Sequence, residues 1–190
     1  MVGQQSDEEL MLAYSDGDLR AFDIIYQRHS GGLFRYLLRQ CSNASDAEEL
    51  FQDVWTNLIR ARERYSVEAK FSTYLYRLAH NRVIDHYRRR AHNPTDKAAN
   101  PDTDDGGPDD LAESGTLDIE DRVHLKRLAS RLLELLDRLP AVQREAFLLR
   151  EEGGFSVEEI AEVMDVNPET AKSRLRYAVA KLRRGLIDDR

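Results

Sequence analysis

Apolar residues recur at intervals of three and four along most of this chain of 190 residues. This spacing places them on one face of an α-helix. Strands would instead show β-branched runs in which apolar and polar residues alternate, and the sequence lacks such runs. The pattern therefore predicts an all-α fold.

The helical pattern stops between Ala91 and Gly115. This stretch carries three prolines, three glycines and many aspartates, and it offers almost nothing to bury. It is typical of a flexible, acidic linker, because a loop of this length is unusual inside a compact domain. We therefore expect two small helical domains, at residues 1–92 and 119–187, joined by a linker at residues 93–118.

Within the first domain, the pattern predicts helix breaks near Asp16-Gly17-Asp18 and near Gly31-Gly32. The next helix has a candidate N-terminal cap at Ser45. Its apolar residues share one face: Ala47, Leu50, Phe51, Val54 and Leu58.

Another face of this helix carries an acidic stripe, formed by Asp46, Glu49 and Asp53. Two interpretations of the acidic stripe stay open at this point. It is either a solvated face whose acids favour the positive end of the helix dipole, or a docking surface for a basic partner.

Residues 71–90, "FSTYLYRLAHNRVIDHYRRR", combine four aromatic residues, five arginines and a single acid. Helical spacing predicts that one face of this segment is buried; its residues are Phe71, Leu75, Leu78, Ala79 and Val83. A different, polar face carries Tyr74, Arg77, Asn81, Asp85 and Arg88. Aromatic rings among guanidinium groups suit single-stranded nucleic acid, whose bases stack and whose backbone needs cations. Half-buried tyrosines with a wet hydroxyl are the alternative.

The stretch "FSVEEIAEVMDVNPETAKSRLRYAVAKLRRG", residues 155–185, predicts a helix-turn-helix. Ser156 and Glu159 form a capping box, and Asn167 with Pro168 starts the second helix. The second helix has an inward stripe of Ala171, Leu175, Ala178 and Leu182, and it leaves outward Thr170, Lys172, Ser173, Arg174, Arg176 and Tyr177. In this motif the second helix enters the major groove of duplex DNA, so the segment indicates DNA binding.

Two further helices precede this motif and meet at Leu139-Pro140. We expect the leucines of the first helix to pack against the second, which contains Phe147 and Leu148; these leucines are Leu132, Leu135, Leu136 and Leu139.

The charge of the chain is unevenly distributed. The net charge is -7, yet residues 61–95 carry +5 and residues 166–190 carry +4. The two basic blocks indicate contact with a polyanion, whereas the excess of acid opposes tight, autonomous binding to nucleic acid. We infer that another protein brings this chain to DNA.

Several classes of protein are disfavoured. Cys41 is the single cysteine, which excludes an internal disulfide, and the acidic N-terminus does not resemble a secretory signal. No apolar run reaches the roughly 18 residues of a membrane span, so we expect a soluble, cytoplasmic protein without membrane insertion. His80 and His86 lie six apart and share no helical face. We predict no catalytic residue, no metal site and no cofactor, and we expect His80 to be a packed or surface residue.

Four segments occur in the order and spacing seen in one family: "DAEELFQDVW", "FSTYLYRLAHN", "LPAVQREAFLLRE" and "FSVEEIAEVMDVNPETAKSRL". They resemble the small extracytoplasmic-function sigma factors, which direct bacterial RNA polymerase to promoters. The resemblance covers nearly the whole chain apart from the linker.

The resemblance implies a role for each block. Core RNA polymerase would bind through the coiled coil of its largest subunit to Asp46, Glu49, Gln52 and Asp53, and its flap would be a second contact. The minus-ten element of the promoter would be read and melted by Tyr65, Phe71, Tyr74, Arg77, Asn81 and Arg88. The outward residues of the second helix of the helix-turn-helix would read the minus-35 element. The linker would enter the polymerase channels, and an anti-sigma factor would clamp the two domains.

The sequence departs from the family pattern at two places. Tyr74 stands where the family usually has tryptophan, and Tyr177 and Val179 stand where it often has basic residues. The alternative is a stand-alone helix-turn-helix regulator that binds operator DNA as a dimer. That class of protein would not account for the acidic stripe or for the helix rich in aromatic residues.

Overall fold

The computed structural model describes residues 5–41, 43–92 and 119–187. These ranges contain only helices, turns and loops, which confirms the all-α fold. The elements are α1 (Asp7–Ser15), α2 (Leu19–Gln40), α3 (Ala44–Ala61), the short 3₁₀-helix η2 (Arg62–Arg64), α4 (Phe71–His92), α5 (Ile119–Asp137), α6 (Ala141–Gly153), α7 (Val157–Val163) and α8 (Pro168–Ile187). The predicted linker lies outside the described residues.

Local capping chemistry explains where several helices begin. Ser156 and Glu159 form the predicted capping box at α7, and the Asn167 side chain accepts a hydrogen bond of 2.8 Å from the Thr170 amide at the start of α8. The cap of α3 differs from the prediction. Asn43 rather than Ser45 accepts the capping hydrogen bond, because helical geometry already begins at Ala44.

The predicted break near Gly31-Gly32 is wrong, since α2 continues through both glycines to Gln40. A glycine inside a helix costs about 1 kcal/mol relative to alanine, which tertiary packing can offset. At Gly32 a methyl group would lie 3.2 Å from the Tyr76 hydroxyl and 3.5 Å from the Glu152 carbonyl oxygen. Glycine therefore lets α2 approach both α4 and the end of α6 closely.

The largest hydrophobic cluster runs through both halves of the chain. Leu33, Leu37 and Leu75 of the first half belong to the same buried cluster as Leu149 and Ile160 of the second. Helix α2 packs on α6, and α4 packs on α7. The two sequence blocks thus lie against each other in a closed arrangement, by which we mean the packing of α2 and α4 on α6 and α7.

A smaller cluster joins α5 to α8. Leu136 and Leu139 pack there with Ala178 and Leu182, and Phe147 lies at its edge. Leu148 of the same helix as Phe147 belongs to the larger cluster.

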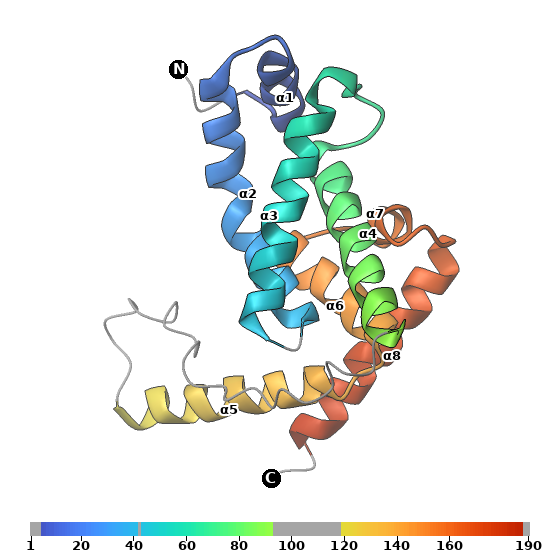
Figure 1. Cartoon of the computed structure of the whole chain (residues 1–190). Helices are drawn as coiled ribbons and strands as arrows, with labels where there is room; N and C mark the ends of the chain where they lie inside the picture. Colours follow the sequence, from blue (N-terminus) through green and yellow to red (C-terminus); the bar gives the residue numbers. More distant parts are fainter. Residues whose placement is uncertain (1–4, 42, 93–118, 188–190) are drawn as a thin grey trace.

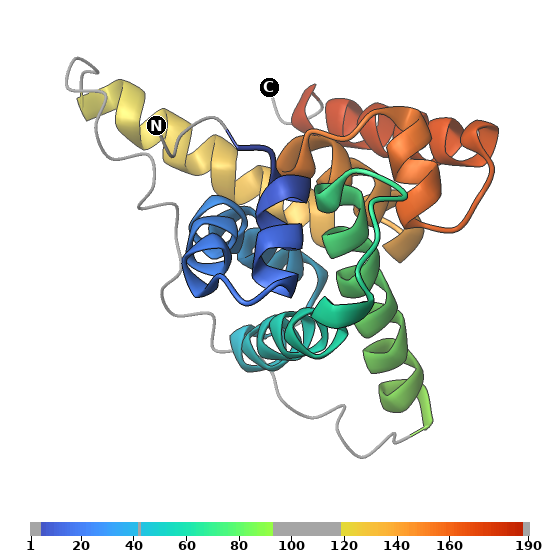
Figure 2. The same ribbon diagram turned by 90° about the horizontal axis from the view of Figure 1, so that it is seen from above.

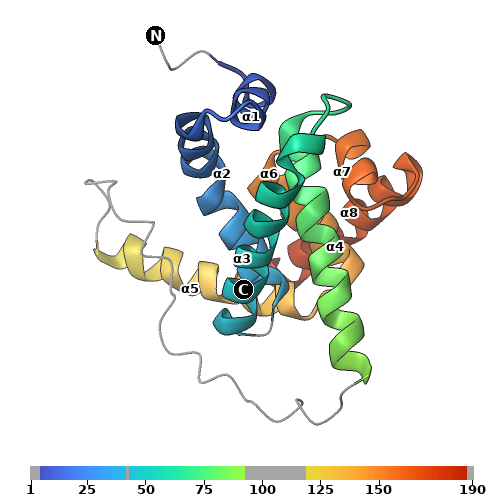
Figure 3. The same ribbon diagram turned by 45° about the horizontal axis from the view of Figure 1, so that its top comes forward.

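The views agree on the arrangement of the helices. Helix α4 lies between α3 and the hairpin formed by α7 and α8 (Figures 2 and 3). Helix α5 extends away from the other helices, with its C-terminal end beside α8 (Figure 1). The aromatic and basic helix α4 and the helix-turn-helix are therefore neighbours in space.

Candidate nucleic-acid interface

A pocket of about 270 Å³ opens beside the first turns of α4. The residues around it come from the loop after α3, from α4 and from α7; they are Ala61, Arg64, Tyr65, Ser66, Glu68, Ala69, Thr73, Tyr74, Arg77 and Glu162. We call this space the aromatic pocket. Its two tyrosine rings, Tyr65 and Tyr74, meet edge to face with 5.4 Å between their centroids.

The Tyr65 hydroxyl is an unusual polar group of the aromatic pocket. Burial raises the pKa of Tyr65 to about 12, with the carboxylate of Glu8 adding to the effect, so the hydroxyl stays protonated near neutral pH. The Tyr65 hydroxyl is buried and has no hydrogen-bond partner among the described residues. A buried polar group without a partner is costly, so a bound molecule that pairs with it gains affinity.

The start of α4 is fixed by the first helix of the chain. The Phe71 amide donates a hydrogen bond of 2.7 Å to the Glu8 carboxylate, and the Phe71 ring packs 5.3 Å from the ring of His29. Phe71 was expected to contact DNA, yet its side chain is fully buried in the core. Its ring meets the ring of Tyr65 edge to face, with 6.3 Å between the centroids, and does not line the aromatic pocket.

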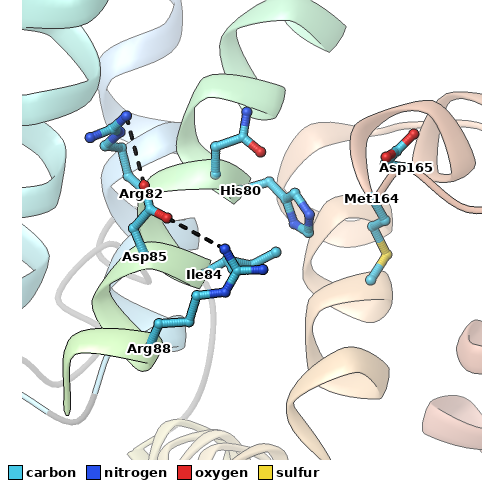
Figure 4. A pocket seen from close by; sticks show the side chains of 8 residues that line it. His80, Arg82, Ile84, Asp85, Arg88, Met164 and Asp165 are labelled. Carbon is cyan, nitrogen blue, oxygen red and sulfur yellow. Dashed lines mark ion pairs between the residues drawn. The ribbon is translucent and has the colours of Figure 1, made fainter. Parts of the chain in front are cut away.

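The polar face of α4 continues from the aromatic pocket toward the end of the helix. Arg77, Asn81 and Arg88 are exposed there, as the spacing predicts. Asp85 lies 3.8 Å from Arg82 and 4.0 Å from Arg88 (Figure 4). A second, more open pocket of about 500 Å³ borders this part of α4, and Met164 and Asp165 line its far side.

Helix α8 exposes half of the predicted outward residues to solvent. Lys172, Arg176 and Tyr177 are exposed, whereas Thr170, Ser173 and Arg174 are half-buried. The Arg176 guanidinium lies 5.3 Å from the centre of the Tyr177 ring. The turn before α8 holds Asp165 at a φ of 52°, a left-handed conformation that few residues other than glycine adopt. This turn fixes the crossing of α7 and α8.

The acidic stripe on α3 is divided in the structure. The Asp46 carboxylate lies 2.9 Å from Arg90 and 3.3 Å from His86, so it ties α3 to the end of α4. Glu49 and the neighbouring Gln52 are exposed, and Asp53 is half-buried. No ion pair of the described residues involves Glu49 or Asp53. These two acids keep their charge available to a partner, whereas that of Asp46 is engaged within the chain.

Comparisons with known proteins agree with this geometry. Residues 25–93 match the family model for sigma-70 region 2, and residues 129–182 match the model for sigma-70 region 4. The chain is 30% identical to the ECF RNA polymerase sigma factor SigE of Mycolicibacterium smegmatis, over 95% of this chain and 69% of that protein. The chain belongs to the extracytoplasmic-function sigma factors.

Other relatives extend along nearly the whole of this sigma factor. The RNA polymerase sigma-H factor of Pseudomonas aeruginosa is 27% identical over 98% of both chains. The sigma factor RpoE of Bartonella quintana, solved in complex with the anti-sigma factor NepR, has a TM-score of 0.68 and 23% identity, over 90% of this chain and 100% of that chain. The sigma factor is thus a DNA-binding factor of transcription initiation, and its family consists of initiation factors without enzymatic activity.

The sigma factor also contains a buried polar cluster that the sequence did not reveal. Glu145 of α6 accepts a hydrogen bond of 2.8 Å from the Tyr36 hydroxyl of α2, and its carboxylate lies 2.5 Å from His80 Nδ1 of α4. Burial, together with the Glu145 charge, raises the pKa of Tyr36 well above its usual value. Because 109 residues separate Tyr36 from Glu145, no local pattern could have predicted this contact.

The part of the chain that the structure describes contains neither a candidate metal site nor a candidate membrane-spanning helix. No group of three or more histidine, cysteine, aspartate or glutamate side chains there could hold a metal ion. No described helix combines the length and the apolar character that a membrane crossing requires.

Proposed function

We propose that this sigma factor binds core RNA polymerase and assigns one promoter element to each half of the chain. Residues 1–92 form the domain that docks on the polymerase and reads and melts the minus-ten element. Residues 119–187 form the domain that reads the minus-35 element, and residues 93–118 connect the two. Core RNA polymerase acts in the bacterial cytoplasm, so the sigma factor acts there as well.

The aromatic pocket is the observation that carries the minus-ten assignment. A base taken out of the DNA stack needs an aromatic face, and its edge needs hydrogen-bond partners. Tyr65 and Tyr74 supply rings, and the Tyr65 hydroxyl supplies a buried donor. Arg64 and Arg77 at the same pocket are suited to the phosphates of an unpaired strand. Asn81 and Arg88 extend this surface along α4.

The exposed part of the acidic stripe supports docking on the polymerase. Glu49, Gln52 and Asp53 would contact the coiled coil of the largest subunit, and Asp46 would hold α3 in place for that contact. The flap would contact the second half of the chain. We also propose an anti-sigma factor as a regulatory partner, since a sigma factor of similar fold is known in complex with one.

Transcription in vitro with core polymerase and sheared genomic DNA from the source organism tests the whole assignment. We expect discrete transcripts that appear only when the sigma factor is added, and their starts map the promoters. A lack of new transcripts together with a lack of binding to core polymerase would overturn the proposed function.

At a promoter mapped in this way, Tyr74→Ala tests the aromatic pocket. We expect open-complex formation to fall about tenfold, because stacking on an aromatic side chain is worth about 1–3 kcal/mol per base. Permanganate reactivity of unpaired thymines measures the opening, and gel mobility at low temperature measures closed binding.

Closed binding should change little, and Tyr74→Trp should retain opening because it keeps an aromatic ring. Equal losses in both assays for Tyr74→Ala would contradict the role of this pocket in melting.

A further inference from the structure

The contact between the two halves of the chain is built from side chains of several helices. The rings of Tyr76 in α4 and Phe155 before α7 meet edge to face at 5.0 Å, and Phe155 is buried. Arg35 of α2 lies 2.8 Å from Glu152 of α6. Arg144 of α6 donates a hydrogen bond of 2.9 Å to the Tyr87 hydroxyl of α4. Apolar, charged and neutral polar contacts thus stabilise the contact surface between the two halves, which we call the seam.

The centre of this seam is polar. Glu145 and its partners Tyr36 and His80 are buried between α2, α4 and α6. A buried carboxylate gains little net stability from its partners, because its desolvation opposes the attraction. Separation of the halves would return Glu145 and His80 to water. These polar groups cost less to separate than apolar groups of the same size, and they lie within the apolar cluster that the two halves share.

In the closed arrangement the acids of α7 lie along the proposed minus-ten surface of α4. The Glu159 carboxylate pairs with Lys70 at 2.7 Å, just before α4 begins. Glu162 lines the aromatic pocket together with Tyr74 and Arg77. Asp165, in the turn after α7, faces His80 and Arg88 across the more open pocket (Figure 4). Three carboxylates thus follow one edge of the helix-turn-helix, and we call them the α7 edge.

The α7 edge matches what that surface would bind in a promoter. A single strand of DNA offers a row of negative phosphates beside its bases, and cations and aromatic rings of the protein receive them. The α7 edge offers a row of negative carboxylates to the same cations. Lys172 and Arg176 of α8 are exposed and lie outside both pockets that the α7 edge borders. The closed arrangement therefore sets the carboxylates of the α7 edge beside the proposed minus-ten surface, whose Arg77, Asn81 and Arg88 remain exposed.

From this geometry we infer that the free sigma factor is closed on itself, and that the carboxylates of its α7 edge lie beside the minus-ten surface and compete with the nontemplate strand for its cations. The inference rests on the proposed function, since it takes the aromatic pocket as the minus-ten site. Opening of the α2–α6 and α4–α7 contacts is then a condition for promoter melting. The chain by itself has a low affinity for single-stranded DNA even though the cations for that contact are present.

Two adjacent glycines offer a matched test. In Gly32→Leu the new side chain meets the Glu152 carbonyl oxygen of α6, because a Cβ alone already lies 3.5 Å from it. In Gly31→Leu the new side chain is exposed, and its Cβ lies in ordinary contact, at 3.5 Å, with the outer guanidinium nitrogen of Arg35, whereas Arg35 pairs with Glu152 through Nε. Both variants remove one glycine from the same helix. Gly32→Leu should open the seam, and Gly31→Leu should leave it closed.

Spin labels report the opening. Burial, and then the Asp46 charge, raise the pKa of the Cys41 thiol to about 12, so labels at neutral pH will react with introduced cysteines first. Thr56→Cys on α3 and Ala180→Cys on α8 are exposed positions on the two halves. We expect one narrow distance distribution in the otherwise unchanged chain and in Gly31→Leu, and a broad, longer one in Gly32→Leu. A broad distribution in the unchanged chain would overturn the inference.

Binding of DNA is the second measurement. The probe is a fluorescent oligonucleotide with the nontemplate minus-ten sequence of a promoter mapped by transcription in vitro. We expect Gly32→Leu to bind it at least tenfold more tightly than the unchanged chain or Gly31→Leu, and Tyr74→Ala to remove the gain. An opened Gly32→Leu chain without the gain would overturn the competition by the α7 edge.

If Gly32→Leu fails to fold, which circular dichroism would reveal, variants with exchanged charges at the ion pair of Arg35 and Glu152 test the same opening. Arg35→Glu should broaden the distance distribution, and Arg35→Glu with Glu152→Arg should narrow it again. An unchanged distribution in both would contradict a seam held by this pair. The tests of the inference and of the proposed function can fail separately. If promoter opening by the holoenzyme depends on Tyr74 but the free chain is already open, the proposed function stands and the inference is refuted.

Discussion

Single side chains connect distant segments of this sigma factor. Asp7, in the first turn of α1, accepts a hydrogen bond of 2.6 Å from Arg28, and its other carboxylate oxygen lies 2.7 Å from His29 Nε2. Both partners belong to α2. Burial alone would raise the pKa of Asp7, but the hydrogen bonds from Arg28 and His29 outweigh it and hold the pKa below 3.8. The folded state therefore favours the ionised carboxylate.

Asp7→Asn should lower the free energy of unfolding near pH 7 by about 1 kcal/mol, because the ion pairs are partly exposed. A lowered pKa stabilises the folded state above the unfolded value of 3.8, and this stability is lost as the pH falls through the still lower folded pKa. The difference between variant and parent should therefore vanish in acid. Urea unfolding at several pH values measures it.

Asp23→Asn removes an exposed carboxylate from α2 and serves as the control for that titration, with little change expected at any pH. A difference for Asp7→Asn that stayed constant down to pH 2 would show that the ion pairs do not set the stability.

At the level of single residues, prediction from sequence succeeded where the chemistry is local. The capping box of Ser156 and Glu159 and the cap at Asn167 depend on neighbours three residues away. His80 was predicted only as packed or exposed, because its partner Glu145 lies 65 residues along the chain. The partners of such a residue are determined by the tertiary fold and cannot be predicted from its neighbours in the sequence.

Each helix combines an inward face with an outward face of a different chemistry. In α8 the inward residues Ala171, Ala178 and Leu182 are buried. The outward face begins with cations near the N-terminus of the helix, which is the end that reaches base edges in a helix-turn-helix. The position of a cation along α8 should thus decide its importance for DNA.

Lys172→Ala combined with Arg176→Ala should reduce binding of the holoenzyme to a minus-35 duplex at least tenfold, because one specific base contact is worth about 1–3 kcal/mol. Lys181→Ala combined with Arg183→Ala removes the same charge from exposed positions further along α8 and should have a much smaller effect. Fluorescence anisotropy with a mapped promoter measures both. Equal losses would assign α8 a general electrostatic role.

At the level of elements, periodicity predicted the faces of α3, α4 and α8 and the two helices around Leu139-Pro140. It failed at Gly31-Gly32, because two glycines resemble a turn in sequence. Glycine at position 32 accommodates the close approach of the Tyr76 hydroxyl of α4 and the contact with Glu152 of α6. Only the tertiary packing reveals that constraint.

For the molecule as a whole, the closed arrangement leaves the α3 surface open to a partner. Glu49 and Gln52 are exposed in it, and neither α6 nor α7 packs on α3. Polymerase could therefore dock on a sigma factor that is still closed. We therefore expect docking on the polymerase and promoter reading to be separable steps.

Reversal of charge at Glu49→Lys and Asp53→Lys together should weaken binding to core polymerase at least tenfold while the helical content stays constant. Asp46 is left intact, since its loss would release Arg90 and His86 from α3. Surface plasmon resonance with immobilised core measures the affinity.

Asp23→Lys with Glu151→Lys changes the charge by the same amount at exposed sites outside the acidic stripe and should bind normally. Unchanged binding of the Glu49→Lys, Asp53→Lys variant would refute the docking surface.

The sequence predicted two helical domains but not how they meet. The pattern of apolar and polar residues along one helix shows which of its faces is buried. It does not show which other helix packs on that face. The continuous core, with Leu33 of α2 and Leu149 of α6 in one cluster, arises from residues that each resemble the core of their own domain. The candidate surfaces were predictable, and the placement of the α7 edge beside one of them was not.

The exposed ion pairs across the seam, Arg35 with Glu152 and Lys70 with Glu159, give dissolved salt two opposing effects on this chain. Added salt screens these pairs and favours opening, and it also weakens the attraction of the uncovered cations for DNA phosphates. The two effects partly cancel. The free sigma factor should therefore respond to ionic strength less steeply than its many arginines alone would imply.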